Sequence, residues 1–196
     1  MAALKCVLSR PEISIVLRKI VELNFRTQRR LIKEYLLPLS AGDRVLDIGC
    51  GIGEFSALFP STQYLGVDID EPSLVLARRR FRREFVYADA TRLPFNDASF
   101  SHALVVGVLH HMNDADAARA LKEIGRVLKF GGQALIMEDT KSTNLLTRMM
   151  HALDQGSFVR TEREWAGLIG PQVSVQEHTT FMNGVCYYSA FIVTRP

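Results

Sequence analysis

Apolar residues in the middle of the chain form short runs that are separated by longer segments of helical spacing. Short runs bounded by glycine, proline or acidic residues predict strands, and the segments between them predict helices. The expected strands cover residues 44–48, 64–67, 85–87, 103–108 and 133–137. The expected helices cover 53–59, a segment opened by Pro72, and 115–128, ended by Gly131 and Gly132. Such alternation favours a parallel sheet with helices on both faces.

The two ends of the chain follow other patterns. Residues 12–37 carry apolar residues at helical spacing, which predicts one or two helices. Beyond residue 139 we expect helices over 143–154 and 161–168, the second begun by a capping box. Residues 172–180 and 186–194 alternate like two strands and predict an antiparallel hairpin at the sheet edge. The whole pattern predicts one α/β domain, doubly wound around a mostly parallel seven-stranded sheet.

The first expected strand runs directly into glycines, and an acid closes the next strand. Gly49, Gly51 and Gly53 follow the strand, and Asp68 lies at the end of the second apolar run. Glycine tolerates positive φ and has no side chain, so backbone can approach a ligand closely. A carboxylate about 20 residues later is placed to bind a ribose diol. This pairing predicts a cofactor that contains a nucleoside.

The acids around this segment indicate the charge of that cofactor. Glu54 occupies the third glycine position of the dinucleotide fingerprint, where a carboxylate would oppose a pyrophosphate. Asp47, Asp68, Asp70 and Asp89 follow or end the neighbouring strands. Carboxylates favour a ligand that carries positive charge, so the sequence favours S-adenosylmethionine over NAD.

Five segments lie in order along the core of the chain. They read R-V-L-D-I-G-C-G-I-G, Y-L-G-V-D-I-D, V-Y-A-D-A-T-R-L-P-F, D-A-S-F-S-H-A-L-V-V-G-V-L-H-H-M and L-K-E-I-G-R-V-L-K-F-G-G. In this order and spacing they resemble class I S-adenosylmethionine-dependent methyltransferases, in particular the small-molecule group that includes the quinone-biosynthesis enzymes. The family usually has proline where this chain has Phe130. The resemblance implies transfer of a methyl group by in-line displacement to an acceptor, expected to be a small molecule.

The resemblance also implies roles for individual residues. Asp68 would bind the ribose, with Asp70 as the rival acid. Asp47 would orient the glycine loop and meet the ammonium, or be a purely structural acid. Asp89 would accept from the adenine amino group, or cap the turn before Thr91. The predicted cofactor-binding residues are Asp47, Gly49, Cys50, Gly51, Asp68, Ile69, Asp89, Ala90, Gly107 and Val108.

Two histidines follow the fourth expected strand, near where the methyl group should emerge. His110 or His111 could take a proton from the acceptor, because the pKa of histidine is near neutrality. Lining or packing of the pocket is the alternative for both. Met149, Met150, Phe158 and Trp165 could form a lid or acceptor pocket, or could equally be helix core.

The resemblance divides the expected domain into three parts. Residues 1–40 would be a helical cap over the cofactor, although simple packing on the sheet is as consistent with the pattern. Residues 41–139 would be the cofactor-binding core, and residues 140–196 would supply the substrate-side helices and edge strands.

Composition narrows the remaining possibilities. The net charge of +3 does not demand a nucleic-acid partner. The cysteines Cys6, Cys50 and Cys186 are far apart and lack the spacing of a metal site, which predicts reduced thiols in a cytoplasmic protein. No apolar run is long enough to predict a membrane span. Five arginines between 78 and 83 predict a solvated helix face or an RNA contact. An RNA or protein methyltransferase and a catalytically silent binding module stay open as alternatives.

Overall fold

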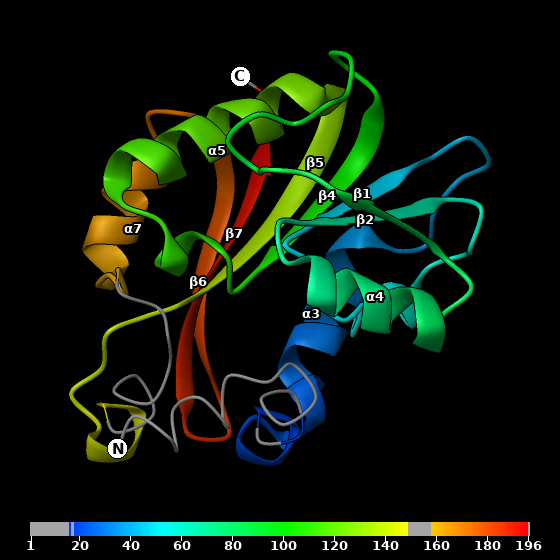
Figure 1. Ribbon diagram of the computed structural model, residues 1–196. Coiled ribbons are helices and arrows are strands. Elements are labelled where there is room, and N and C mark those ends of the chain that lie inside the picture. Colours follow the sequence, from blue (N-terminus) through cyan, green and yellow to red (C-terminus); the bar gives the residue numbers. More distant parts are fainter. Residues whose placement is uncertain (1–15, 17, 149–157, 196) are drawn as a thin grey trace.

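The computed structural model describes residues 16, 18–148 and 158–195, and its centre is a seven-stranded sheet of order β3-β2-β1-β4-β5-β7-β6 (Figure 1). The strands are β1 Val45–Ile48, β2 Tyr64–Asp68, β3 Glu84–Tyr87, β4 Phe100–Val106, β5 Leu128–Asp139, β6 Ser174–Asn183 and β7 Cys186–Thr194. Neighbours from β3 to β5 pair in parallel, and β7 pairs antiparallel with both β5 and β6. The predicted sheet and its antiparallel edge hairpin are confirmed.

Helices cover both faces of the sheet, as a doubly wound fold requires. On one face, α5 Asp114–Val127 and α7 Glu162–Ile169 pack against the sheet, and on the other, α3 Arg26–Leu36 and α4 Glu71–Arg80 do so (Figure 1). Alternate residues of β1 point to the two cores, since Leu46 belongs to the α5 side and Val45 to the α3 side.

Local sequence signals set the starts of two helices. Asp70 caps α4, because its Oδ2 accepts from the Ser73 amide at 3.0 Å, and Pro72 lies in the first turn. Thr161 and Glu164 form the predicted capping box at the start of α7. Both helices therefore begin where side-chain oxygens satisfy the first backbone amides.

The helix predicted over residues 53–59 is wrong. Residues 51–55 form turns, followed only by the short 3-10 helix η2, Ser56–Leu58. Gly51 and Gly53 have φ of 51° and 75°, outside the right-handed helical region. The glycines thus close a compact loop instead of opening a helix, which corrects the placement of Glu54 in a first helical turn.

The end of α5 and the start of β5 also differ from the prediction. The strand begins at Leu128, immediately after the helix, so Gly131 and Gly132 lie inside it. The pairing of β4 with β5 shifts register between Phe100 and His102, and Gly131 has φ of 74°. These glycines lie where the pairing of β4 with β5 is irregular, and they do not end the helix.

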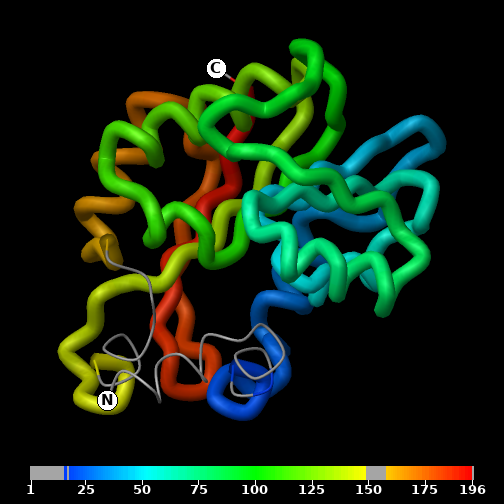
Figure 2. Tube along the Cα trace, viewed as in Figure 1, coloured from blue at the N-terminus to red at the C-terminus, as the bar shows by residue number. Residues whose placement is uncertain are grey.

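The N-terminal segment contains two helical pieces joined by an unusual turn. Residues 16 and 18–21 are helical, and η1 Leu23–Phe25 turns the chain into α3 with positive φ at all three residues. This segment lies beside the tip of the β6–β7 hairpin, where the Val185 amide donates to the Val21 carbonyl at 3.4 Å (Figure 2). Residues 145–148 are helical, residues 143 and 144 are not, and residues 149–154 of the predicted helix lie outside the described residues.

Candidate functional site

The carboxyl ends of β1 and β4 meet at the glycine loop. Gly49 leaves β1 with φ of 71°, and a Cβ added there would lie 2.3 Å from Val108 Cγ2. Only glycine therefore permits this approach between the loop and the segment after β4. Gly51, with φ of 51°, has nothing within 4 Å of an added Cβ, so the backbone at the loop's apex borders open space.

Asp68 links the second strand to this loop. Its Oδ2 accepts from the Gly51 amide at 2.7 Å, and its Oδ1 accepts from the Asp70 amide at 2.8 Å. Burial raises the pKa of the Asp68 carboxyl, and the backbone amides oppose that rise. Its rival Asp70 is engaged as the cap of α4, and the adjacent Ile69 is 59% exposed at the same edge. The structure thus brings the glycines and the predicted ribose acid together.

The third strand ends at the same edge. The Ala88 amide donates to the Asp68 carbonyl at 3.0 Å, which places Asp89 and the buried Ala90 next to β2. Asp89 is exposed, and its Oδ1 accepts from both the amide and the hydroxyl of Thr91 at 2.8 Å. The capping contact proposed as the alternative is therefore present. The adenine contact stays a prediction.

Asp47 and Cys50 lie beneath the loop instead of on its surface. Asp47 is 2% exposed, and its Oδ2 accepts from the Tyr64 hydroxyl at 2.6 Å. Burial raises the pKa of Asp47 to about 7, because the hydrogen bond from Tyr64 offsets only part of the lost hydration. Burial also raises the pKa of the Cys50 thiol, which therefore stays protonated and is a poor nucleophile.

The segment after β4 is held by a buried carboxylate that sequence reasoning missed. Glu138 Oε1 accepts from the amides of Val108 and Leu109 at 3.0 and 2.8 Å. Its Oε2 accepts from the His110 amide at 3.2 Å and lies 2.9 Å from His110 Nδ1. Glu138 and His110 are both fully buried. A pair of acids at the end of a buried strand was the available signal, but the expected strand ended at Met137.

An arginine holds the other end of the same segment. Arg160 donates to the carbonyl of Leu109 at 3.2 Å and to that of Met112 at 2.8 Å. Its Nη2 also lies 2.7 Å from Asp114 Oδ1, at the start of α5. No local pattern marks this arginine, because its partners in this segment are more than 40 positions away in the chain. Together, Glu138 and Arg160 bind three amides and two carbonyls of the segment that carries both histidines.

The two histidines lie in different surroundings. His110 is buried against Glu138, whereas His111 is exposed, and their ring centroids are 4.1 Å apart. Burial and the Glu138 contact favour a positioning role for His110. The base role of either histidine stays a prediction. In the predicted lid, Trp165 is fully buried and donates to the Asp139 carbonyl at 3.0 Å, so it is helix core. Met149 and Met150 lie outside the described residues.

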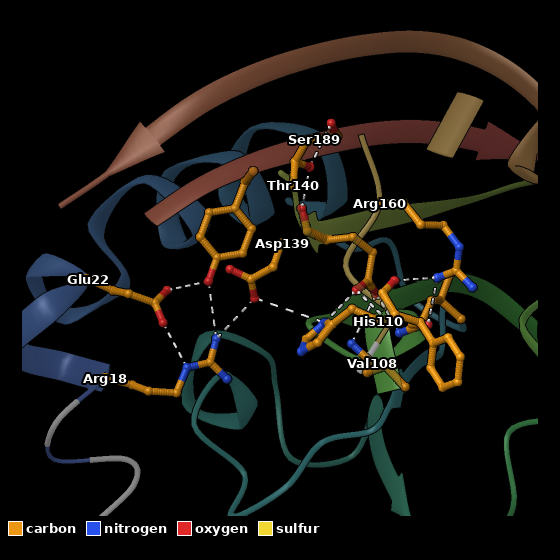
Figure 3. A network of polar contacts seen from close by, with 12 residues as sticks. Arg18, Glu22, Val108, His110, Asp139, Thr140, Arg160 and Ser189 are labelled. Atoms are coloured by element: carbon orange, nitrogen blue, oxygen red, sulfur yellow. Dashed lines mark hydrogen bonds and ion pairs between the residues drawn. The ribbon is translucent and has the colours of Figure 1, made fainter. Parts of the chain in front are cut away.

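A polar network extends from these residues to the N-terminal helix (Figure 3). We call Arg18, Glu22, His110, Glu138, Asp139 and Tyr188 the polar network. The Tyr188 hydroxyl donates to Glu22 Oε2 at 2.6 Å, and Arg18 Nε donates to Glu22 Oε1 at 2.7 Å. Arg18 Nη2 and His110 Nδ1 each lie 4.0 Å from Asp139 Oδ2. Burial, followed by the nearby Asp139 charge, raises the pKa of Tyr188, so its hydroxyl stays a donor.

The polar network brings the N-terminal helix to the carboxyl end of β4, which we call the reaction end of the sheet because the predicted cofactor contacts lie there. A Cβ built on Gly107 would lie 3.6 Å from Arg18 Nη2 and 3.4 Å from the His110 ring. Gly107 immediately follows β4 and is one of the predicted cofactor contacts. The sequence did not single out Arg18, Glu22 or Tyr188, because 166 positions separate Glu22 from Tyr188.

Comparison with known proteins agrees with this geometry. Residues 46–136 match the protein family described as "Methyltransferase domain". Ubiquinone/menaquinone biosynthesis C-methyltransferase UbiE of Pseudomonas putida is 38% identical over 144 residues, which are 66% of this chain and 55% of that relative. These matches support a class I S-adenosylmethionine-dependent methyltransferase domain over residues 46–136. The family uses S-adenosylmethionine as methyl donor.

One further relative matches in sequence, and one solved structure matches in fold. A tRNA (carboxymethyluridine(34)-5-O)-methyltransferase of Arabidopsis thaliana is 33% identical over 121 residues, 60% of this chain and 30% of that protein. A crystal structure of a protein from Pyrococcus horikoshii shares the fold with a TM-score of 0.71 at 21% identity, over 94% of this chain and 99% of that one. The chain spans about half the length of the UbiE relative. No described helix has the length and apolar character needed to cross a membrane, and no group of described residues has the composition of a metal site.

Proposed function

We propose that this protein transfers a methyl group from S-adenosylmethionine to a small-molecule acceptor. The observation that carries the proposal is the position of Asp68, whose carboxylate is hydrogen-bonded to the glycine loop at Gly51 and lies beside β3. A carboxylate in this place can accept from a ribose diol, while the open backbone at Gly51 leaves room for the rest of the nucleoside.

The charges at this edge suit a cation better than a pyrophosphate. Residues 51–58 form turns and η2, so no α-helix begins directly after the glycine loop to receive a pyrophosphate. Glu54 is 9% exposed and is paired with Lys19 and Arg29, which ties the loop to the N-terminal helices. Asp68 and Asp89 supply the negative charge at the edge, which supports a sulfonium cofactor.

The chemistry needs little beyond alignment. The sulfonium is already a good leaving group, so the acceptor–carbon bond forms as the carbon–sulfur bond breaks, and S-adenosylhomocysteine leaves with the electron pair. Holding the two reactants about 3–3.5 Å apart supplies most of the acceleration. In this proposal, Gly107 and Val108 line the methionine end, and Arg18 and Glu22 form the inner side of a helical cap that excludes water. The UbiE relative is named for ubiquinone and menaquinone biosynthesis, which supports a small, apolar acceptor.

Replacement of Asp68 tests the proposal. We expect Asp68→Ala to weaken the binding of S-adenosylhomocysteine about 10- to 100-fold, because a hydrogen bond to a charged group contributes about 1.5–3 kcal/mol. Titration calorimetry measures this affinity directly.

Asp70→Asn is the matched control, since it removes an acid two residues away while asparagine still caps α4. It should bind S-adenosylhomocysteine like the wild-type protein. Equal affinities for wild-type and Asp68→Ala would refute the assigned role. Binding of NADH without any binding of S-adenosylhomocysteine would refute the proposed cofactor.

A tRNA acceptor is a second candidate, supported by the relative from Arabidopsis thaliana. The arginine cluster gives it limited support. Arg78 binds Glu71 and the Phe85 carbonyl, and Arg83 donates to the Phe59 carbonyl, so both are used within the fold. Transfer of radiolabelled methyl groups to total tRNA, compared with a pool of quinols and other small metabolites, distinguishes the two acceptors. Cofactor binding without transfer to either pool would favour the silent binding module.

A further inference from the structure

The N-terminal helix reverses the usual arrangement of polar and apolar faces. Arg18 on the helix and Glu22 directly after it point into the protein, and Glu22 is only 1% exposed (Figure 3). Among the described apolar residues of the helix, Val21 is partly buried, whereas Val16 and Ile20, one turn apart, are 55% and 69% exposed. A surface helix normally buries its apolar stripe, as α5 does. An exposed stripe on a helix that is anchored by its charges indicates a surface that contacts an apolar partner.

Two neighbouring segments add to this surface. The Val185 amide donates to the Val21 carbonyl, and the Thr147 hydroxyl donates to the Val185 carbonyl at 2.6 Å, so the hairpin tip joins the N-terminal helix to residues 145–148. The segments lie together at one end of the molecule (Figures 1 and 2). Half of the exposed large hydrophobic side chains in the described ranges belong to these segments and the turn that follows the helix. We call them the apolar patch: Val16, Ile20, Leu23, Leu145, Leu146 and Met182.

A row of cations begins where the apolar patch ends. Arg26, Arg30 and Lys33 recur at helical spacing along the exposed side of α3. Together with Arg29, they line a cavity of about 490 Å³ that also includes Leu23, and no acidic residue is part of its lining as far as the chain is described. Arg29 pairs with Glu54, whereas the other three form no ion pair with any described residue. The cavity therefore offers a site for an anionic head group beside aliphatic side chains.

We propose that the apolar patch and this cationic cavity dock the protein onto the surface of an anionic lipid bilayer. All six side chains of the patch are aliphatic, whereas proteins that bind single-stranded RNA stack bases on aromatic residues. Aliphatic side chains enter the boundary between head groups and acyl chains, and adjacent lysines and arginines bind anionic head groups. Because Arg18 on the same helix lies close to Gly107, docking brings the reaction end of the sheet next to the bilayer. This inference goes beyond the proposed function and does not depend on it.

Co-sedimentation with vesicles tests the docking surface. We expect the wild-type protein to bind phosphatidylcholine vesicles that contain phosphatidylglycerol, to bind pure phosphatidylcholine more weakly, and to lose binding as salt is raised. Arg26→Glu combined with Arg30→Glu should lower the partition coefficient for anionic vesicles at least about tenfold. Ile20→Ser combined with Leu145→Ser should lower it for both kinds of vesicle.

Matched controls lie elsewhere on the chain. Arg79→Glu with Arg82→Glu makes the same charge change at two exposed arginines outside the patch, and Phe130→Ser removes a side chain that is 82% exposed. Both controls should bind like the wild-type protein, and thermal unfolding verifies that each variant folds.

Three results would overturn the proposal. The first is the absence of wild-type binding to anionic vesicles, and the second is an equal loss of binding in the control variants. The third is a different occupant of the patch in the absence of vesicle binding. Either RNA is retained on a filter, or sedimentation velocity shows a dimer that Ile20→Ser dissociates.

Discussion

The two sides of the proposed reaction site are built in different ways. On the cofactor side, the glycine loop and Asp68 follow consecutive strands. The shape of this side is set by the positive φ of the glycines and by the Gly51 amide that donates to Asp68. On the opposite side, the polar network joins side chains from the N-terminal helix, the end of β5 and β7. The first side depends on a short motif whose spacing is visible in the chain. The second depends on the docking of elements that are far apart in sequence.

Each side contains a buried carboxylate, and the two have different partners. Asp47 accepts from a single hydroxyl, that of Tyr64, and burial raises its pKa to about 7. Glu138 accepts from three backbone amides and contacts His110. A carboxylate with several donors organises the backbone around it, whereas one with a single donor mainly bears the cost of lost hydration. The two sites should therefore respond in opposite ways when the charge is removed.

Removal of the Glu138 carboxylate should have the largest effect. Glu138→Ala leaves the amides of Val108, Leu109 and His110 without their acceptor in the core, so we expect a loss of stability of about 3–5 kcal/mol. Urea unfolding measures this loss. Glu138→Gln keeps one acceptor oxygen and should lose less. If alanine and glutamine cost the same small amount, the carboxylate does not organise this segment.

Neutralisation of Asp47 should change the pH dependence of stability. The pKa of Asp47 is higher in the folded state than in the unfolded chain, so its contribution to stability is complete at low pH. That contribution declines as the pH rises through the range from the ordinary aspartate value to about 7. Asp47→Asn removes the decline, so the stability of the variant relative to the wild-type protein should increase by about 4 kcal/mol between acidic and mildly basic pH.

Urea unfolding of both proteins at several pH values follows this difference. The asparagine of the Asp47→Asn variant still offers an oxygen to the Tyr64 hydroxyl, and Tyr64→Phe separates the effect of that hydrogen bond. A constant difference between wild-type and Asp47→Asn across the pH range would contradict the raised pKa.

Loss of the Tyr188 hydroxyl should have the smallest effect on stability and a separate effect on activity. Tyr188→Phe removes the donor to Glu22 and the acceptor for Arg18, so we expect a loss of about 1–2 kcal/mol. If the N-terminal helix covers the reaction end, the variant should also raise the KM for the acceptor while cofactor affinity is unchanged. Tyr187→Phe, in the adjacent position of β7, is the control. An unchanged KM would show that the helix packs on the sheet without shaping the acceptor site.

The parts of the fold that the residue pattern predicts are those that depend on local sequence. Alternating runs predict the sheet and its edge hairpin, Pro72 predicts the start of α4, and a capping box predicts the start of α7, because these features depend on neighbours in the chain. The prediction of a helix over 53–59 is wrong because Gly49, Gly51 and Gly53 adopt positive φ. Gly49 packs closely against Val108, and Gly53 packs closely against Phe85. The same spacing therefore serves a loop or a helix, according to its tertiary neighbours.

The resemblance to the methyltransferase family, the glycine loop and the proposed ribose acid, Asp68, are visible in the amino-acid chain. Each depends on residues that are close together in sequence or that recur at the ends of successive parallel strands. The burial of Asp47, the position of Glu138 beneath the His110 segment, and the inward-facing charges of the N-terminal helix follow from folding. These features depend on distances between elements that the chain separates by up to 166 positions. Such distances are set when the strands pair and the helices pack, and no local pattern encodes them.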